Sequence, residues 1–266
     1  MILKRKIYKK LLEWKNECQG KKALLIEGAR RIGKSTICEE FGKNEYESYL
    51  LIDFAKKDKE VERYFERYLN DLDTFFMLLQ THFGIKLTER NSLIIFDEVQ
   101  MFPQARAAIK YLVADGRYDY IETGSLISIR ENVKNIVIPS EERNINMYPL
   151  DFEEFAIALE EDLLVEYIKK CFEKREPLER SMHNQAMLLF HQYMLVGGMP
   201  MPVVSFIENK KDFTEADKEK RDILKLYRED IMKIDMRYRS KVLAIYDQIP
   251  GFLSQHEKRV VFKKLQ

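Results

Sequence analysis

Short apolar runs alternate with amphipathic, helix-like segments along the first 150 residues of the chain. Four of these runs have the length and the flanking residues of β-strands: residues 23–27, 48–54, 92–96 and 120–124. Strands that are apolar at nearly every position are typical of a parallel sheet covered by helices on both faces. The pattern therefore predicts an α/β fold, preceded by an amphipathic helix around Leu11 and Trp14.

The pattern changes near residue 150, where helical periodicity continues without a further strand. Asp151 and Glu154 have the spacing of a capping box and predict the start of a helix. Paired glycines and Pro200 in the segment 196–203 predict a joint between two helices, to which we assign no chemistry. We expect three parts: an α/β core over residues 1–150, an all-helical lid over 151–235 and a further region over 236–266.

Composition and charge exclude several classes of protein. Hydrophobic residues make up 45% and charged residues 33% of the 266 residues, which is typical of a folded globular chain. Lys plus Arg number 45 and Asp plus Glu number 44, so the chain is not a generally basic, DNA-coating protein. No apolar run is long enough to cross a membrane and no signal peptide is evident, so we expect a cytoplasmic protein without a membrane partner. Three widely spaced cysteines predict neither a disulfide framework nor a zinc site.

The segment GARRIGKST stands between the first apolar run and a helical pattern. It matches G-x-x-x-x-G-K-[ST], the phosphate-binding loop of P-loop NTPases, and the strand before it and the helix after it argue against a chance match. Glycines let backbone N–H groups point inward, and the helix presents its positive end to the phosphates. We expect Lys34 to act on the outer phosphates and Ser35 to bind Mg²⁺. The residues expected to contact the nucleotide are Gly28, Ala29, Arg30, Arg31, Ile32, Gly33, Lys34, Ser35 and Thr36.

A second motif, SLIIFDEVQ, places two carboxylates directly after an apolar run. We expect Asp97 to hold Mg²⁺, usually through water, and Glu98 to accept a proton from an attacking water molecule. Acidic residues also follow strands at ordinary protein surfaces, so this motif alone is weak. Together with the loop, it predicts a site that binds a nucleoside triphosphate with Mg²⁺ and hydrolyses it.

Several further segments give the chain a resemblance to a known family. Besides GARRIGKST, they are FDEVQMFP (96–103), IETGS (121–125), YPLDFEEF (148–155) and LVGGMP (195–200). In this order they resemble the prokaryotic AAA-type P-loop ATPases that usually carry a C-terminal domain of unknown function, with winged-helix and nuclease-like parts. The resemblance implies an additional-strand, catalytic-glutamate sheet, in which the strand ending in IETGS lies between the loop strand and the strand before Asp97. It also implies that the nucleotide is ATP.

The resemblance implies additional residues at the outer phosphate. Thr123 or Ser125 would sense this phosphate, and Gln100 fits the family's DExQ pattern; a turn cap and an ordinary polar loop residue are the alternatives. Arg143 stands where relatives have an arginine that could stabilise developing charge in catalysis. Glu142 replaces the glycine that relatives have before it, and a surface ion pair is the alternative for Arg143.

The region 236–266 is locally basic and resembles the start of a winged-helix unit. Its basic residues are Arg237, Arg239, Lys241, Lys258, Arg259, Lys263 and Lys264. We expect a DNA or protein partner to bind here, with a solvated helix face as the alternative. Because VFKKLQ lacks a helix-ending residue, we expect this unit to be truncated.

Three functions fit these features. The first is a Mg²⁺-dependent ATPase whose hydrolysis moves the helical part, and the second is a slow ATP-operated switch that regulates a partner or a DNA-binding domain. A P-loop kinase is the third, but the segment after residue 150 begins with the acidic DFEEF instead of an arginine-rich lid. The sequence leaves the oligomeric state open.

Overall fold

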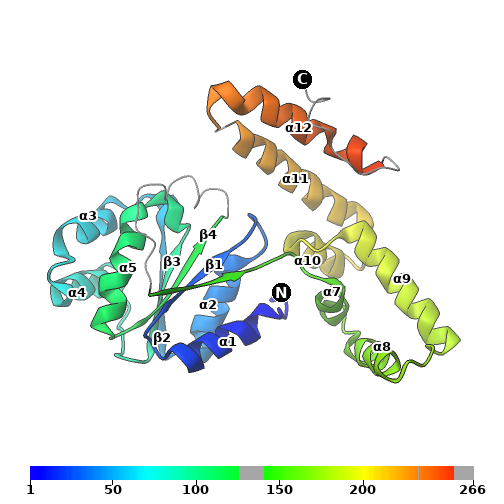
Figure 1. The fold of residues 1–266 in the computed structure, drawn as a ribbon, viewed down its shortest axis with the longest axis horizontal. Helices are drawn as coiled ribbons and strands as arrows, with labels where there is room; N and C mark the ends of the chain where they lie inside the picture. The colour runs from blue at the N-terminus through cyan, green and yellow to red at the C-terminus, as the bar shows by residue number, and fades with distance from the viewer. Residues whose placement is uncertain (126–140, 233, 255–266) are drawn as a thin grey trace. The chain divides into compact units, whose positions relative to one another are not determined.

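The computed structural model describes residues 1–125, 141–232 and 234–254 (Figure 1). Contacts divide the chain into two compact units, Met1–Val204 and Ser205–Gln266. The boundaries expected near residues 150 and 235 fall inside these units, and the division into three functional parts stays a prediction.

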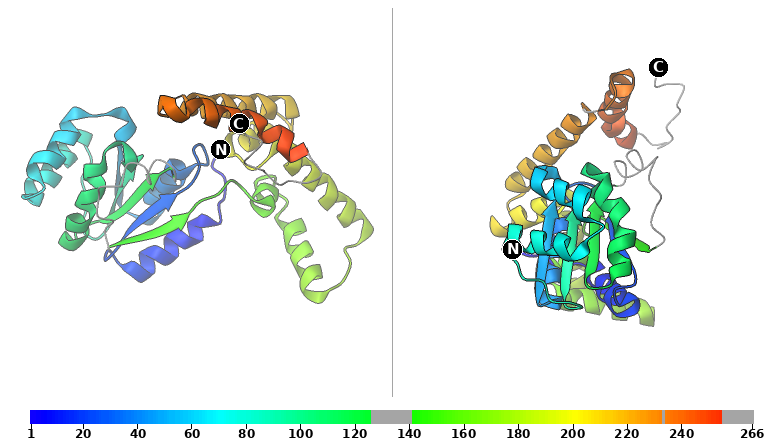
Figure 2. Two further views of the ribbon diagram at one scale, coloured as in Figure 1. Left: turned by 45° about the horizontal axis from the view of Figure 1, so that its top comes forward. Right: turned by 90° about the vertical axis from the view of Figure 1, so that its left-hand side faces the viewer.

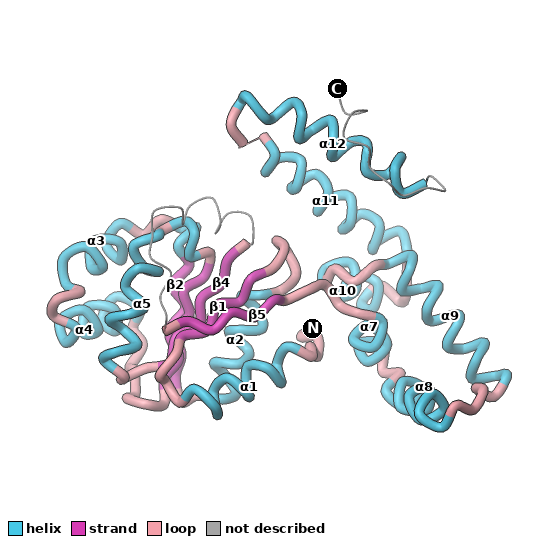
Figure 3. Tube along the Cα trace, in the orientation of Figure 1, coloured by secondary structure: helices cyan, strands magenta, loops and turns pink. Residues whose placement is uncertain are grey.

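The first unit contains a five-stranded sheet. The strands are β1 (Ala23–Glu27), β2 (Ser48–Asp53), β3 (Ser92–Asp97), β4 (Asp119–Gly124) and β5 (Glu142–Asn146). Figure 3 shows them side by side in magenta, in the order β2-β3-β4-β1-β5, and each neighbouring pair is parallel. The strand that carries IETGS therefore lies between the loop strand β1 and the strand β3 that ends in Asp97. The fold class and this strand order are confirmed.

The fifth strand, β5, is absent from the sequence prediction. Its sequence ERNIN has one apolar residue, Ile145, among four polar ones, and β5 forms the edge of the sheet next to β1. An edge strand of mainly polar residues lacks the apolar run by which the other four strands were recognised. Hydrogen bonding to β1 defines this strand, because its sequence carries no pattern for one.

Helices cover both faces of the sheet, as the apolar strands predicted (Figure 2). One face packs against α3 (Lys59–Tyr68), α4 (Leu72–Phe83) and α5 (Pro103–Asp115), and the other against α1 (Ile7–Cys18) and α2 (Lys34–Glu45). Two short 3-10 helices, η1 (Phe54–Lys56) and η2 (Val99–Met101), follow β2 and β3. Leu11 and Trp14 of α1 are buried, so the expected N-terminal amphipathic helix is confirmed.

Helices follow the sheet, as the change of pattern near residue 150 predicted. They are α7 (Phe152–Ala158), α8 (Asp162–Lys174), α9 (Arg180–Val196) and α10 (Pro200–Glu208). The capping box before α7 is confirmed: the Glu154 N–H donates to the Asp151 carboxylate at 2.9 Å, and the Asp151 N–H donates to the Glu154 carboxylate at 3.2 Å. The expected joint between helices lies between Val196 and Pro200.

The second unit contains α11 (Phe213–Ile231) and α12 (Met236–Ser254). An ion pair of 2.9 Å between Arg228 and Asp247 joins the two helices. Of the expected basic residues, Arg237 pairs with Asp235 at 2.7 Å. Four others lie outside the described residues: Lys258, Arg259, Lys263 and Lys264. The winged-helix resemblance stays a prediction. No helix within the described ranges combines the length and the apolar character needed to span a membrane.

Candidate functional site

The predicted phosphate loop joins the end of β1 to the start of α2, at the carboxyl edge of the parallel sheet. Two of its positions require glycine. A Cβ on the buried Gly28 would collide with the Met147 carbonyl oxygen and would lie 2.6 Å from Ile32 Cδ1. Gly33 has a φ of 89°, in the left-handed region that favours glycine. The loop therefore follows a tight path that the sequence motif specifies.

The remaining loop residues divide into one anchor and several exposed positions. Ile32 is fully buried in the core between the sheet and α1 and α2. The side chains of the other predicted contact residues are exposed: Ala29, Arg30, Arg31 and Thr36. An apolar anchor thus fixes the loop, and its backbone N–H groups and the residues that begin α2 are the groups that could meet an anion.

Lys34 is the first residue of α2 and is 5% exposed. Its Nζ donates to the carbonyl oxygens of Gly28, at 3.1 Å, and Ala29, at 2.9 Å. Burial lowers the pKa of Lys34, against the opposing influence of the Glu98 and Asp97 carboxylates. The lysine charge is therefore held over the loop, beside the acidic pair, where an anion is the favourable partner.

Ser35 and Asp97, the two predicted metal ligands, are in direct contact. Ser35 Oγ lies 2.8 Å from both carboxylate oxygens of Asp97, which is 7% exposed. Thr123 on β4 donates a further short hydrogen bond to the same carboxylate. A hydroxyl and a carboxylate are hard oxygen ligands that suit Mg²⁺, which takes its remaining ligands from phosphates and water. Among the described residues, no group of three or more His, Cys, Asp and Glu side chains is arranged to hold a metal ion.

Glu98 follows Asp97 and has a φ of 53°, in the left-handed region. Its N–H donates to Thr123 Oγ1 at 3.2 Å, and its carboxylate accepts a short hydrogen bond from Gln100 Nε2. Of the two hydroxyl residues that the resemblance offered as sensors, Thr123 contacts Asp97, and Ser125 follows the end of β4. The structure thus brings both carboxylates, Thr123 and the loop together.

The structure does not bring Arg143 to the loop. Arg143 lies opposite Leu24, near the start of both strands, whereas the loop begins after Glu27, roughly 13 Å further along at about 3.3 Å per residue. Its guanidinium pairs with Glu17 on α1 at 2.5 Å, and this pairing raises the pKa of Arg143. In this structure Arg143 therefore forms a surface ion pair. The position of Arg143 does not support the catalytic role that the resemblance implies.

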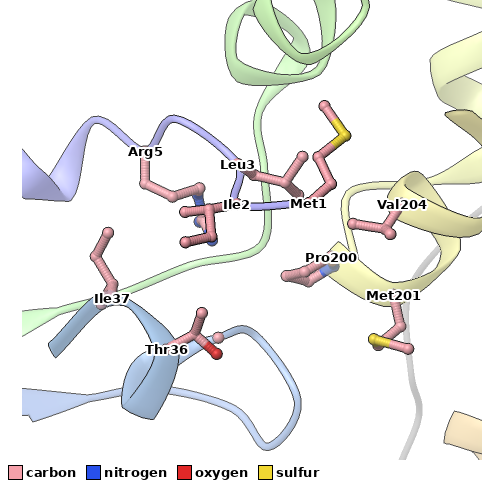
Figure 4. Close-up of a pocket in the computed structure, with 10 residues that line it drawn as sticks. Met1, Ile2, Leu3, Arg5, Thr36, Ile37, Pro200, Met201 and Val204 are labelled. Carbon is pink, nitrogen blue, oxygen red and sulfur yellow. The ribbon is translucent and has the colours of Figure 1, made fainter. Parts of the chain in front are cut away.

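An apolar pocket of about 120 Å³ lies next to the loop (Figure 4). The loop and α2 contribute Gly33, Thr36 and Ile37, and the remaining lining comes from the first residues of the chain and from α10. Pro200, to which we assigned no chemistry, lines this pocket. A Cβ added to Gly33 would lie 3.7 Å from Pro200 Cγ. The resemblance of LVGGMP to the family was the one sequence signal that this segment matters. Tertiary packing alone places the segment beside the loop.

Comparison with known proteins gives one family match. A family model described as an AAA domain matches residues 20–156, which are 137 of the 266 residues. No curated protein matches the chain significantly.

Three solved structures are distantly similar to this chain. The Aeropyrum pernix ORC1 protein, solved in complex with DNA, has 8% identity and a TM-score of 0.39 over 100% of this chain and 81% of that chain. C. elegans PCH-2 has 12% identity and a TM-score of 0.39 over 81% and 65% of the two chains. A Signal Transduction ATPase with Numerous Domains from Pyrococcus horikoshii, with a tetratricopeptide repeat sensor, has 16% identity and a TM-score of 0.42 over 99% and 38%. Likeness at this level assigns no function.

Proposed function

The chain belongs to the AAA domain family, which implies ATP binding and hydrolysis, and from this premise we propose a Mg²⁺-dependent ATPase whose site is built by the loop Gly28–Ser35 and the β3 carboxylates. One observation carries the proposal: Ser35 at the start of α2 and Asp97 at the end of β3 are 2.8 Å apart, although 62 positions separate them in sequence. Tertiary structure thus supports a joint role that the two motifs predicted separately.

Phosphate binding would use the loop backbone and Lys34. The loop N–H groups and the start of α2 provide partial positive charge, and Lys34 adds a full charge in a buried position. When bound, Mg²⁺ supplies charge neutralisation between the outer phosphates. Ser35 and Asp97 would hold the metal, and Thr123 would keep the Asp97 carboxylate oriented.

Hydrolysis would use Glu98 as the group that accepts the proton from water. Thr123 holds the backbone of Glu98, and Gln100 holds its carboxylate, so the side chain has a defined direction. A positioned carboxylate can orient water in line with the outer phosphate, and positioning accounts for much of the catalysis of phosphoryl transfer.

The pocket beside Gly33 and Thr36 would accept the nucleobase. It adjoins the loop, as the base end of a bound nucleotide requires, and its lining is mainly apolar, with Pro200 and Met201 on one side. Apolar walls next to a few polar groups are typical of ligand pockets. This placement supports a nucleoside triphosphate over inorganic phosphate as the ligand.

A slow ATP-operated switch is the alternative function. The hydrogen bond from Gln100 occupies one oxygen of the Glu98 carboxylate, and turnover would be slow if this bond persisted with ATP bound. Both functions would couple the nucleotide to the helical parts of the chain and, through the C-terminal region, to a DNA or protein partner.

Titration of the purified chain with labelled ATP and GTP, with and without Mg²⁺, tests the binding step. Glu98→Gln should retain ATP affinity within about twofold and lose hydrolysis. The control Glu66→Gln, on the exposed surface of α3, should retain both ATP affinity and hydrolysis. Undiminished turnover in Glu98→Gln would remove Glu98 from the mechanism. A folded wild-type chain that ignores every nucleoside triphosphate would refute the proposal. Fast ATP hydrolysis that responds to duplex DNA would favour the ATPase whose hydrolysis moves the helical part over the slow switch.

A further inference from the structure

Arg5 connects three segments of the first unit, and none of the motifs includes it. It lies just before α1, and its side chain is 6% exposed. Its guanidinium donates to the carbonyl oxygen of Ile32 in the loop, at 3.0 Å, and to that of Tyr148, at 2.6 Å. It also lies 3.3 Å from the Glu154 carboxylate at the start of α7. A buried arginine with these partners ties the loop to the start of the helical part.

The contact with Ile32 constrains a particular peptide group. In a planar trans peptide, the carbonyl oxygen of one residue and the N–H of the next point in opposite directions. A guanidinium that holds the Ile32 carbonyl on one side therefore turns the N–H of Gly33 to the other side. Because the Ile32 side chain is also fully buried, this peptide is fixed at two points. Gly33 immediately precedes Lys34, so its N–H belongs to the group of donors at the start of α2.

Glu154 is the ionic partner of the Arg5 guanidinium, with its carboxylate 3.3 Å from Arg5 Nε. Its carboxylate accepts the N–H of Lys6 at 2.6 Å and the N–H of Asp151 at 3.2 Å, and it is itself 8% exposed on its side chain. Arginine presents its donors in a rigid planar fork. An ion pair at the Nε edge therefore favours the orientation in which the two terminal nitrogens face the carbonyl oxygens of Ile32 and Tyr148. Glu154 of the α7 capping box thus contacts Arg5, and Arg5 contacts the loop at the Ile32 carbonyl oxygen.

We propose that Arg5 is a positioning residue of the phosphate loop, which turns the Gly33 N–H toward the β-phosphate end of a bound nucleotide and is itself oriented by Glu154. This inference rests on the proposed function, because it assigns a phosphate to the face of the peptide opposite Arg5. It also gives a physical route by which the start of α7 influences the affinity of the loop.

The test compares ATP, ADP and AMP affinities of the full chain, measured by displacement of a fluorescent ADP analogue. Arg5→Gln should weaken ATP and ADP binding about tenfold more than it weakens binding of AMP, which lacks the β-phosphate. Arg5 also lines the pocket beside the loop, and a loss through that pocket lowers all three affinities by the same factor. Glu154→Gln should give the same pattern with a smaller loss. The control is Lys6→Met, because Lys6 is the neighbouring cation and its Nζ pairs with Asp151 and Glu153 instead of the loop; all three affinities should stay unchanged.

A structural role alone gives a different result. If Arg5 only stabilises the fold, Arg5→Gln lowers the unfolding midpoint and leaves the ratio of ADP to AMP affinity unchanged, and this outcome overturns the inference. If Arg5→Gln does not fold, the ratio of ADP to AMP affinity is measured in Arg5→Lys and Glu154→Gln instead. Equal affinities in Arg5→Gln and Lys6→Met would refute the inference while the proposed function stands. A wild-type chain that binds none of the nucleotides would refute both.

Discussion

Replacement of Thr123 by valine tests how the site holds its carboxylates. The Thr123 side chain is fully buried, donates to Asp97 and accepts the N–H of Glu98. Valine keeps the shape and removes the hydroxyl. Loss of a hydrogen bond to a charged group costs about 1.5–3 kcal/mol, and an unsatisfied N–H adds about 1–3 kcal/mol. We expect Thr123→Val to lower the free energy of unfolding by roughly 2.5–6 kcal/mol.

Thr123→Ser is the matched variant, because it keeps the hydroxyl and loses one buried methyl group. That loss costs about 1 kcal/mol. Urea unfolding followed by tryptophan fluorescence measures both variants. The chain has one tryptophan, Trp14, which is 1% exposed and lies in the first unit, so the signal reports on the unit that contains the site.

Function should follow the same order. With Asp97 no longer held from β4, Thr123→Val should lose most of the stabilisation that Mg²⁺ and ATP give the wild type, and Thr123→Ser should keep it. Unfolding energies of Thr123→Val within about 0.5 kcal/mol of wild type would refute the hydrogen-bond argument. A serine variant less stable than the valine variant would show that methyl packing, not the hydroxyl, dominates.

Three other substitutions test separate parts of the site. Gly28→Ala should weaken ATP binding at least tenfold, because its Cβ would collide with the Met147 carbonyl; calorimetric titration measures this, and near-normal affinity would contradict the steric argument. Burial lowers the pKa of Lys34 below its ordinary value of 10.5, so the unfolded chain binds this proton more tightly than the folded chain does. The Lys34 charge therefore destabilises the nucleotide-free fold at neutral pH, and this destabilisation fades as the pH rises toward 10.5. Lys34→Met should therefore raise the urea midpoint at pH 7 while it weakens ATP binding tenfold or more, and a lowered midpoint would contradict the sign of this effect. Arg143→Ala should leave turnover within about twofold, because Arg143 pairs with Glu17; a tenfold loss would return Arg143 to the site.

The sequence by itself determined the α/β class, four of the five strands and the two motifs of the site. These follow from local rules: apolar runs of strand length mark buried strands, and glycines, a lysine and a hydroxyl at fixed spacing mark a phosphate loop. The capping box at Asp151 is equally local, since its two hydrogen bonds join residues three apart.

Tertiary structure decided what these local rules do not encode. The edge strand β5 exists through its pairing with β1, because its mainly polar sequence carries no strand pattern. Register placed Arg143 near the start of its strand, so an arginine that the resemblance assigned to the phosphates instead pairs with a neighbouring helix. Chain packing brought Pro200 and Arg5 against the loop from distant parts of the sequence. Contacts of this kind depend on which surfaces meet in three dimensions, and the spacing of residues along one chain does not contain that information.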